Sequence, residues 1–388
     1  MKKQKICIIG GGLTGLITAI TLSKLKVSVD LIVDRMESNI DSNRTIAISQ
    51  DNYDFLQDLK VFKLNNNQFW PCKGMKLYTK NKNNKVEEIF KLEKINKKIF
   101  YMIKNSKVID LALRELKKDK SISIIKNRKI NDIFSSGSLN YIKVKKKILK
   151  YNLIILSAGG ASSLVKKIFK EKSLEHSYGE TSLTTIIKHN TFSNNIARQI
   201  FLEDEIIALL PISKNQTSIV WSAKKSLLNE KININLLFKD KIKTYTKEYF
   251  NKIKVDKKIE KRNLNFLIRK KYYKERVLLF GDSLHVIHPL AGQGFNMIIR
   301  DLMSLSKALK NKINLGLDIG DESLLSEFSN DSKPRNFVYS IGIDLTKSYF
   351  SVKQKSFKNL RNRMLTIVNK SKLAKIFFFN LANRGLRF

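Results

Sequence analysis

The sequence KICIIGGGLTGLITAI at residues 5–20 joins a short apolar run, a cluster of glycines and a segment with apolar residues at the helical period. The run Ile6–Ile9 is typical of a parallel strand that is buried on both faces. Gly10, Gly12 and Gly15 follow in the GxGxxG spacing. This order predicts a strand, a tight turn and a helix, with the glycines at the turn and at the helix start.

A second strand and a carboxylate complete this pattern. The apolar segment Val27–Val33 predicts the strand, and Asp34 ends it. In such a unit a carboxylate roughly 20 residues after the last glycine binds a ribose hydroxyl, and Asp34 lies at about this distance from Gly15. The glycines permit a close approach of the backbone to a pyrophosphate, and the helix start presents its amides to that anion. We therefore expect a dinucleotide at this turn. The spacing leaves open whether it is FAD or NAD(P).

A second glycine cluster, GDSLHVIHPLAGQGFNMIIRD at residues 281–301, follows the apolar segment Val277–Phe280. Asp282 would lie at the end of this strand, where its carboxylate can accept hydrogen bonds from ribityl or ribose hydroxyls. Gly292 and Gly294 open a helix, and a helix start presents free amides and a partial positive charge. Because a reduced flavin carries negative charge, this cluster favours a flavin ligand over a plain turn before a core helix.

Two histidines in the second cluster, His285 and His288, could form a metal site together with Asp282. However, Pro289 follows directly, and the surrounding glycines favour a loop pressed against a planar ligand over a metal centre. We expect the histidines to be structural and predict no bound metal. No side chain is assigned as a catalytic acid or base, because a flavin would itself carry the chemistry.

The composition is that of a globular chain with a large excess of positive charge. The 388 residues include 74 Lys and Arg against 34 Asp and Glu, a net charge of +40, and 43% are hydrophobic. No apolar run reaches the roughly 20 residues that a membrane-spanning helix needs. Lysines predominate and are scattered along the chain, whereas nucleic-acid surfaces usually cluster their charge and use Arg. We expect no nucleic-acid binding and leave attraction to anionic lipid headgroups open.

The termini and the cysteines bear on the compartment. The run Ile6–Ile9 is too short for the core of a signal peptide, and Cys7 and Cys72 lie far apart, so we expect a cytoplasmic protein without a disulfide framework. Near the C-terminus, basic residues flank the apolar segment Ile376–Phe379, as in interfacial helices. This segment would hold the protein peripherally at the inner face of the cytoplasmic membrane, or it would pack within the fold or against a second subunit.

Closely spaced strand patterns in the middle of the chain predict an antiparallel sheet. The predicted strands are Thr181–Lys188, Ile206–Ile212 and Thr217–Ser222, with a helical patch at Ile196–Phe201 between them. The Lys-rich stretch 224–261 is predicted as a solvated helical segment. Because the N-terminal unit predicts a parallel sheet and this region an antiparallel one, we expect two domains.

Together these motifs resemble the single-component FAD-dependent aromatic hydroxylases of the para-hydroxybenzoate hydroxylase type, in particular the branch of ubiquinone-biosynthesis hydroxylases. The resemblance is carried by GGGLTG at 10–15, RTIAIS at 44–49, YGE at 178–180, LLP at 209–211, VW at 220–221 and, most specifically, the cluster at 281–301. The chain departs from the family pattern at Ala158–Gly160, where relatives have Ala-Asp-Gly, and at Glu180, where they have Gln.

The resemblance implies an α/β fold with a Rossmann-like FAD-binding domain of the GR2 type, an inserted antiparallel β-sheet substrate domain and C-terminal helices. The FAD-binding domain would comprise residues 1–74, 96–175 and 266–335, the substrate domain 75–95 and 176–265, and the C-terminal helical segment 336–388.

The resemblance also implies which residues form the sites. Those expected to hold FAD are Gly10, Gly12, Leu13, Thr14, Gly15, Asp34, Arg35, Arg44, Gly281, Asp282, Pro289, Gly292, Gln293, Gly294, Phe295 and Asn296. Candidates for the wall of a substrate pocket are Leu209, Pro211 and Trp221, which could equally be the core of the sheet.

The implied activity is that of a monooxygenase which uses FAD, NAD(P)H as co-substrate and O2. It would hydroxylate the ring of a polyprenylated phenol in ubiquinone biosynthesis through a flavin C4a-hydroperoxide. Expected partners are the hydrophobic phenol, O2, and a membrane surface or other ubiquinone-biosynthesis proteins.

Two other classes of function remain open at this stage. One is an FAD-dependent reductase or dehydrogenase of the polyprenyl reductase type, which does not use oxygen. The other is a non-catalytic basic protein that binds nucleic acid or membranes and keeps FAD as a structural group.

Overall fold

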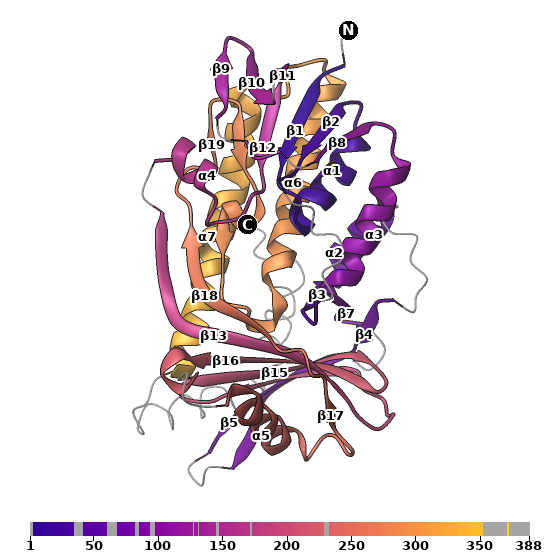
Figure 1. The fold of residues 1–388 in the computed structure, drawn as a ribbon, viewed down its shortest axis with the longest axis vertical. Helices are drawn as coiled ribbons and strands as arrows, with labels where there is room; N and C mark the ends of the chain where they lie inside the picture. Colours follow the sequence, from indigo (N-terminus) through magenta and orange to yellow (C-terminus); the bar gives the residue numbers. More distant parts are fainter. Residues whose placement is uncertain are drawn as a thin grey trace.

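The computed structural model describes residues 3–34, 42–59, 68–81, 85–93, 98–126, 128–130, 132–144, 147–170, 173–228, 233–351 and 371. A parallel sheet covered by helices forms one end of the molecule, and a large antiparallel sheet forms the other (Figure 1). Two long strands and one long helix run between these ends (Figure 1).

The first sheet is built from the apolar segments that the sequence marks as buried strands. Its six strands, in spatial order, are β19 (Tyr273–Lys274), β20 (Val277–Leu279), β12 (Leu153–Leu156), β1 (Lys5–Ile9), β2 (Ser28–Ile32) and β8 (Ile122–Ile125). All neighbours pair in parallel except β19 and β20. The predicted N-terminal unit is confirmed, because α1 (Leu13–Ser23) lies between β1 and β2 in the chain.

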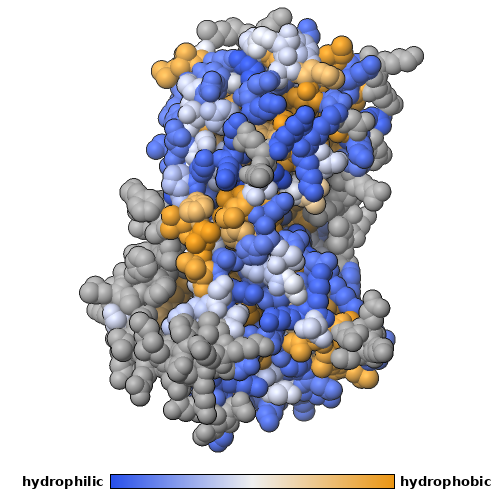
Figure 2. Space-filling view, turned by 90° about the vertical axis from the view of Figure 1, so that its left-hand side faces the viewer, coloured by the Kyte–Doolittle hydropathy of each residue, from blue (hydrophilic) through white to orange (hydrophobic). Residues whose placement is uncertain are grey.

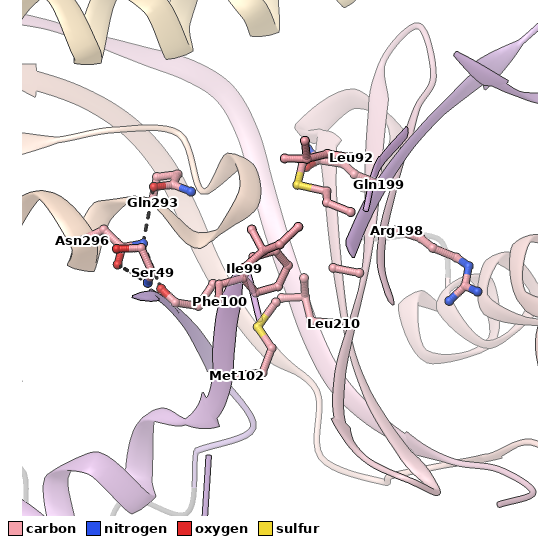
Figure 3. A pocket seen from close by; sticks show the side chains of 13 residues that line it. Ser49, Leu92, Ile99, Phe100, Met102, Arg198, Gln199, Leu210, Gln293 and Asn296 are labelled. Atoms are coloured by element: carbon pink, nitrogen blue, oxygen red, sulfur yellow. Dashed lines mark hydrogen bonds between the residues drawn. The ribbon is translucent and has the colours of Figure 1, made fainter. Parts of the chain in front are cut away.

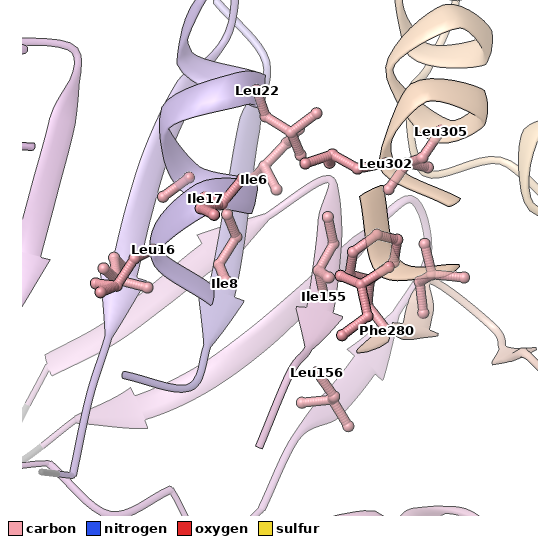
Figure 4. Close-up of a cluster of buried hydrophobic side chains, with 14 of the residues drawn as sticks. Ile6, Ile8, Leu16, Ile17, Leu22, Ile155, Leu156, Phe280, Leu302 and Leu305 are labelled. Carbon is pink, nitrogen blue, oxygen red and sulfur yellow. The ribbon is translucent and has the colours of Figure 1, made fainter. Parts of the chain in front are cut away.

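Helices pack on this sheet and close its core. They include α1, α3 (Asn105–Lys118) and α6 (Gly294–Asn314). Figure 4 shows how Leu16 and Ile17 of α1 and Leu302 of α6 lie over the strands, among side chains that are almost fully buried. Burying each such side chain contributes about 1.5–3 kcal/mol to the stability of the fold. Because this core includes the strands and helices that flank both glycine clusters, it holds both clusters at the same sheet.

The second sheet contains nine strands and is mainly antiparallel. Its path runs β21 (His285–Val286), β18 (Glu260–Ile268), β13 (Leu174–Lys188), β16 (Gln216–Lys224), β15 (Glu205–Ser213), β14 (Ile196–Phe201), β5 (Gly74–Lys80) and β6 (Val86–Glu93), with β17 (Lys254–Val255) paired to β13. The predicted antiparallel meander is confirmed. On one face of this sheet lies α5 (Ile234–Thr246), whose Phe238 stacks on Trp221 at 5.5 Å between ring centroids.

Two predictions for the middle of the chain need correction. Ile196–Phe201 is not a helical patch but strand β14, which pairs with β15 antiparallel and with β5 in parallel. A short apolar run fits a helix or a strand equally well, and pairing on both edges decides here for the strand. The stretch 224–261 does contain α5, but its last residues begin β18. The predicted boundaries at 265 and 335 fall inside β18 and α7 (Glu322–Ser351).

Two small sheets and several short helices complete the fold. One three-stranded sheet contains β3 (Thr45–Ser49), β7 (Phe100–Lys104) and β4 (Trp70–Cys72), and another contains β11 (Lys147–Tyr151), β10 (Leu139–Val144) and β9 (Phe134–Ser136). The remaining helices are α2 (Gln50–Asp58), α4 (Ser163–Ile168) and the 3-10 turns η1 (Lys225–Leu228), η2 (Gly281–Ser283) and η3 (Leu290–Gly292).

The surface is largely hydrophilic on the side that Figure 2 presents, with apolar side chains gathered near the middle of the molecule. Exposed apolar residues of α7 include Phe337, Val338 and Leu345. Within the described residues, no helix combines the length and the apolar character that crossing a bilayer requires. The predicted interfacial segment Ile376–Phe379 lies outside the described residues.

Candidate functional site

The N-terminal turn has no room for side chains. Gly10 adopts φ +139°, and a Cβ added there would lie 2.4 Å from the carbonyl oxygen of Ser157. A Cβ on Gly15 would lie 2.0 Å from the carbonyl oxygen of Gly10. Because a real Cβ never approaches an oxygen so closely, the turn and the start of α1 can pack this tightly only with glycine.

The start of α1 is open to an anion. Its N-cap is Gly12, which has no side chain to accept hydrogen bonds from the first amides, and the first turn, which begins with Leu13 and Thr14, contains no acidic residue. The unpaired amides of a helix start attract phosphate groups. This cradle therefore fits the pyrophosphate of a dinucleotide such as FAD.

The two glycine clusters meet in space, although they lie far apart in the sequence. Gly281 adopts φ +64°, and a Cβ added there would come within 2.5 Å of Thr14 Cγ2. Asp282 is exposed beside this contact. The carbonyl oxygen of Asp282 lies 3.0 Å from the position of a Cβ on Gly160, so the segment Ala158–Gly160 also packs against this junction. One extended ligand could thus contact both clusters.

The predicted residues of the adenosine end lie at the rim of this site. Asp34 follows β2 and is exposed, so its carboxylate is accessible to a ribose. Arg44 is exposed just before β3, and its carbonyl oxygen accepts a hydrogen bond from the amide of Asn105 at 2.8 Å. Arg35 lies outside the described residues. Gly159, where the family resemblance implies Asp, adopts φ +84°, and a Cβ added there would have nothing within 4 Å.

The start of α6 is held by the side chain of Asn296. Its Oδ1 accepts from the Ser49 amide and from Asn52 Nδ2, each at 2.9 Å, while its Nδ2 donates to the Ala47 carbonyl at 2.9 Å and to Gln293 Oε1 at 3.3 Å. These partners occupy the amide fully. Asn296 therefore joins α6 to β3 and α2, and only its backbone amide is left for a cofactor.

The loop before α6 brings further backbone groups to the same place. Gly292 adopts φ +66°, and a Cβ there would lie 3.1 Å from Ala47 Cβ. The N-cap residue of α6, Gln293, makes no capping hydrogen bond with its side chain, so the amides that begin with Gly294 and Phe295 remain available. Pro289 is exposed. This helix start can stabilise negative charge on a flavin.

Each histidine of the second cluster has a buried carboxylate partner. His285 Nε2 lies 2.9 Å from Asp301 Oδ2, and His288 Nε2 lies 3.1 Å from Glu180 Oε2. Lys347 Nζ lies 2.8 Å from the other oxygen of Glu180. Burial by itself raises the pKa of the Glu180 carboxyl, but hydrogen bonds from His288 and Lys347 lower it below its ordinary value. These contacts tie both histidines to other segments of the fold.

A narrow, partly enclosed cavity lies beside the start of α6 (Figure 3). Its lining is mostly apolar and comes from β3, β7, the nine-stranded sheet and α6. The residues are Ala47, Ser49, Met75, Leu92, Ile99, Phe100, Met102, Ala197, Arg198, Gln199, Leu210, Gln293 and Asn296. A mostly apolar lining between the start of α6 and the nine-stranded sheet favours a hydrophobic ligand over a charged one.

The residues predicted for the pocket wall lie on the other side of the sheet. Leu209 and Trp221 belong to the core under α5, and Trp221 Nε1 donates to Glu205 Oε2 at 2.8 Å. Pro211 follows Leu209 by two positions on β15, on the same strand face. The register instead turns Leu210 into the cavity. Neighbouring strand residues point to opposite faces, so a shift of one residue reverses the assignment.

Sequence reasoning also missed most of the cavity wall. Met75 and Leu92 come from the strand pair β5 and β6, and Gln199 comes from the strand that was predicted as helix. Ser49 lies within the RTIAIS motif, and Gln293 and Asn296 lie within the second glycine cluster, so two motifs of the sequence include residues of this wall. The others have no motif of their own, because only the pairing of distant strands brings them together.

Comparison with protein families supports the same cofactor. A family model described as FAD binding domain matches residues 3–130 and 154–336, most of the chain.

Characterised relatives are similar over part of their length. The mitochondrial ubiquinone biosynthesis monooxygenase COQ6 of Homo sapiens is 26% identical over 251 residues, which cover 56% of this chain and 54% of that protein. The ubiquinone hydroxylase UbiL of Rhodospirillum rubrum is 26% identical over 199 residues, which cover 51% of this chain and 46% of that protein. The chain thus spans about half the length of the curated relatives it matches.

Solved structures match the whole fold. The p-nitrophenol 4-monooxygenase PnpA of Pseudomonas putida DLL-E4 has a TM-score of 0.81 at 16% identity, over 100% of this chain and 99% of that chain. HpxO of Klebsiella pneumoniae, complexed with FAD and uric acid, has a TM-score of 0.74 at 13% identity, over 98% of this chain and 97% of that chain. At these identities the likeness shows the fold.

Proposed function

This chain belongs to the FAD binding domain family, and we propose that it is a monooxygenase which hydroxylates the aromatic ring of a prenylated phenol in ubiquinone biosynthesis. NAD(P)H and O2 would be its co-substrates. The observation that carries the proposal is the apolar cavity, which borders the start of α6 at Gln293 and Asn296. The names of the relatives COQ6 and UbiL support the substrate class.

The residues of the two glycine clusters fit the cofactor of this family. The start of α1 at Gly12 would bind the pyrophosphate, and Asp34 a ribose hydroxyl. Asp282 would bind the ribityl chain, and the amides at Gly294 would lie against the ring. When bound, FAD supplies the redox chemistry and the reaction with oxygen. We propose the parallel sheet as the cofactor unit and the nine-stranded sheet as the substrate unit.

The protein's own task would be to position the ring and to exclude water. Leu210, Met102 and Phe100 present apolar surface to the cavity, which suits a hydrophobic phenol. An apolar enclosure also removes water that would otherwise compete for a reactive oxygen species. We also propose that the prenylated substrate reaches this protein from a membrane surface or from another protein of the pathway.

The test begins with the visible spectrum of the purified protein, which should show bound flavin. We then expect 2-geranylphenol to stimulate NADPH oxidation, with a product whose mass is increased by one oxygen atom. Assays with and without O2 separate the competing functions. A folded protein that stays colourless and takes up no added FAD would contradict the proposal. NADPH oxidation that continues unchanged without oxygen, with no hydroxylated product, would instead identify a reductase.

A further inference from the structure

The sheet wall of the cavity contains an amide among apolar neighbours. Gln199, on β14, lines the cavity and is only 4% exposed. Around it on the nine-stranded sheet, the lining residues include Ala197, Leu210 and Met75. Gln199 shares the strand face of Ala197, because side chains alternate along β14. A polar side chain at this position is therefore enclosed in an otherwise apolar wall.

Gln199 differs from the other amides of the cavity in its hydrogen bonding. Asn296 uses its side chain fully within the fold, and Gln293 Oε1 accepts from Tyr339 Oη at 2.7 Å and from Asn296. In the part of the chain that the structure describes, the Gln199 side chain forms no hydrogen bond. Because the side chain is largely enclosed, few water molecules can reach its amide, so a hydrogen-bond partner in the cavity would stabilise it.

The cavity offers no charged group to a ligand. Arg198 contributes to the lining, but its guanidinium points away from the cavity (Figure 3). It lies 4.6 Å from the ring centroid of Tyr249, and its Nη1 donates to the Ile196 carbonyl at 3.1 Å. No other Lys or Arg, and no Asp or Glu, is among the described residues of the lining. An anionic ligand would thus enter an apolar space without a counter-charge.

We infer that Gln199 determines substrate specificity by hydrogen-bonding the oxygen substituent of a neutral aromatic ring. This inference rests on the proposed function and adds the chemical class of the ligand. An amide offers both a donor and an acceptor, so it can accept from a phenol hydroxyl and donate to its oxygen at once. A carboxylated ring would be excluded, since no cation in the lining balances its charge.

The experiment measures ligand binding through the flavin absorption of the FAD-loaded protein, without NADPH. The ligands are 2-geranylphenol, geranylbenzene, which lacks the hydroxyl, and 3-geranyl-4-hydroxybenzoate, which adds a carboxylate. We expect the wild type to bind 2-geranylphenol at least about tenfold more tightly than either other ligand. In Gln199→Met, which keeps the side-chain shape, 2-geranylphenol should lose this advantage over geranylbenzene.

Gln216→Met, the same change at the β15–β16 end of this sheet, is the matched control and should bind like the wild type. Should Gln199→Met fail to retain FAD, Gln199→Asn keeps the amide but withdraws it by one methylene. It should weaken 2-geranylphenol binding severalfold and leave geranylbenzene unchanged.

Suppose that Gln199→Met, or Gln199→Asn where that variant is used instead, keeps the full preference of the wild type for 2-geranylphenol over geranylbenzene. That result would overturn the role of Gln199 and leave the proposed function intact. Tightest binding of the carboxylated ring by the wild type would overturn the neutral-ligand assignment. If the FAD-loaded wild type neither binds nor hydroxylates 2-geranylphenol, the proposed function fails, and the inference fails with it.

Discussion

The two glycine clusters reach the same ligand site by different means. The N-terminal turn is held mainly by backbone packing within the first sheet, where Gly10 and Gly15 lie against each other and against Ser157. The second cluster is held by side chains from distant segments. The first cluster therefore needs only its own sheet, whereas the second depends on the assembled fold.

Helix α7 supplies a partner to two residues of the second cluster, Asp301 and Gln293, and to Glu180, which pairs with His288 of the same cluster. Asn336 Nδ2 donates to both oxygens of Asp301 at 2.9 Å, and Asp301 pairs with His285. Tyr339 hydrogen-bonds Gln293, and Lys347 pairs with Glu180, the partner of His288. The second cluster is thus coupled to the C-terminal helix, whereas among the described residues the N-terminal turn is not coupled in this way. Three substitutions test this difference.

The largest effect is expected in the N-terminal turn. Gly15→Ala adds a Cβ that would lie 2.0 Å from the Gly10 carbonyl oxygen, so the turn must open and FAD binding should be lost. Gly342→Ala on α7 is the control, because a Cβ there has nothing within 4 Å. It should leave FAD content unchanged and stabilise the helix by roughly 0.5–1 kcal/mol. Flavin content per folded protein is the measurement, and full content in Gly15→Ala would refute the close packing.

A smaller effect is expected at the second cluster. Asn296→Ala removes the amide that joins α6 to β3 and leaves the Ser49 amide and the Ala47 carbonyl without this partner. We expect the free energy of unfolding to fall by about 2–4 kcal/mol, because buried groups that lose a partner cost about 1–3 kcal/mol each and do not add fully. Asn330→Ala, on exposed α7 surface, is the control. Equal denaturation midpoints for the two variants would argue against a loop held by tertiary contacts.

The smallest effect is expected at Glu180, and it depends on pH. The pKa of Glu180 is lowered in the fold from its ordinary value of 4.5. Its carboxylate therefore stabilises the protein above about pH 4.5, and this contribution is lost as pH falls through the lowered pKa. At pH 7, Glu180→Gln should lower the free energy of unfolding by about 1–3 kcal/mol.

The measurement for Glu180 is urea unfolding of both proteins across this pH range. The difference in the free energy of unfolding between wild type and Glu180→Gln should become smaller as the pH falls below 4.5. Glu327→Gln, at an exposed position of α7, should show little difference at any pH. If the difference in the free energy of unfolding between wild type and Glu180→Gln stays constant down to low pH, the charge of the carboxylate is not what stabilises the cluster.

Several features could be predicted because their physics is local. The turn at Gly10–Gly15 needs glycine for steric reasons, and the strand Ile6–Ile9 is apolar because both its faces are buried. The antiparallel strands are visible in the sequence as closely spaced apolar segments. By contrast, the choice between Leu209 and Leu210 for the cavity depends on a one-residue register that the apolar pattern does not specify, since both faces of β15 are buried.

The sequence by itself determined the glycine turn after the first strand and the parallel and antiparallel sheets, because neighbours in the chain impose them. Only the tertiary structure decided that Gly281 packs on Thr14, that Glu180 pairs with His288 and Lys347, and that Gln199 faces the cavity. These contacts join residues from separate strands and helices. Their geometry follows from how the two sheets and α7 pack, and no local pattern encodes it.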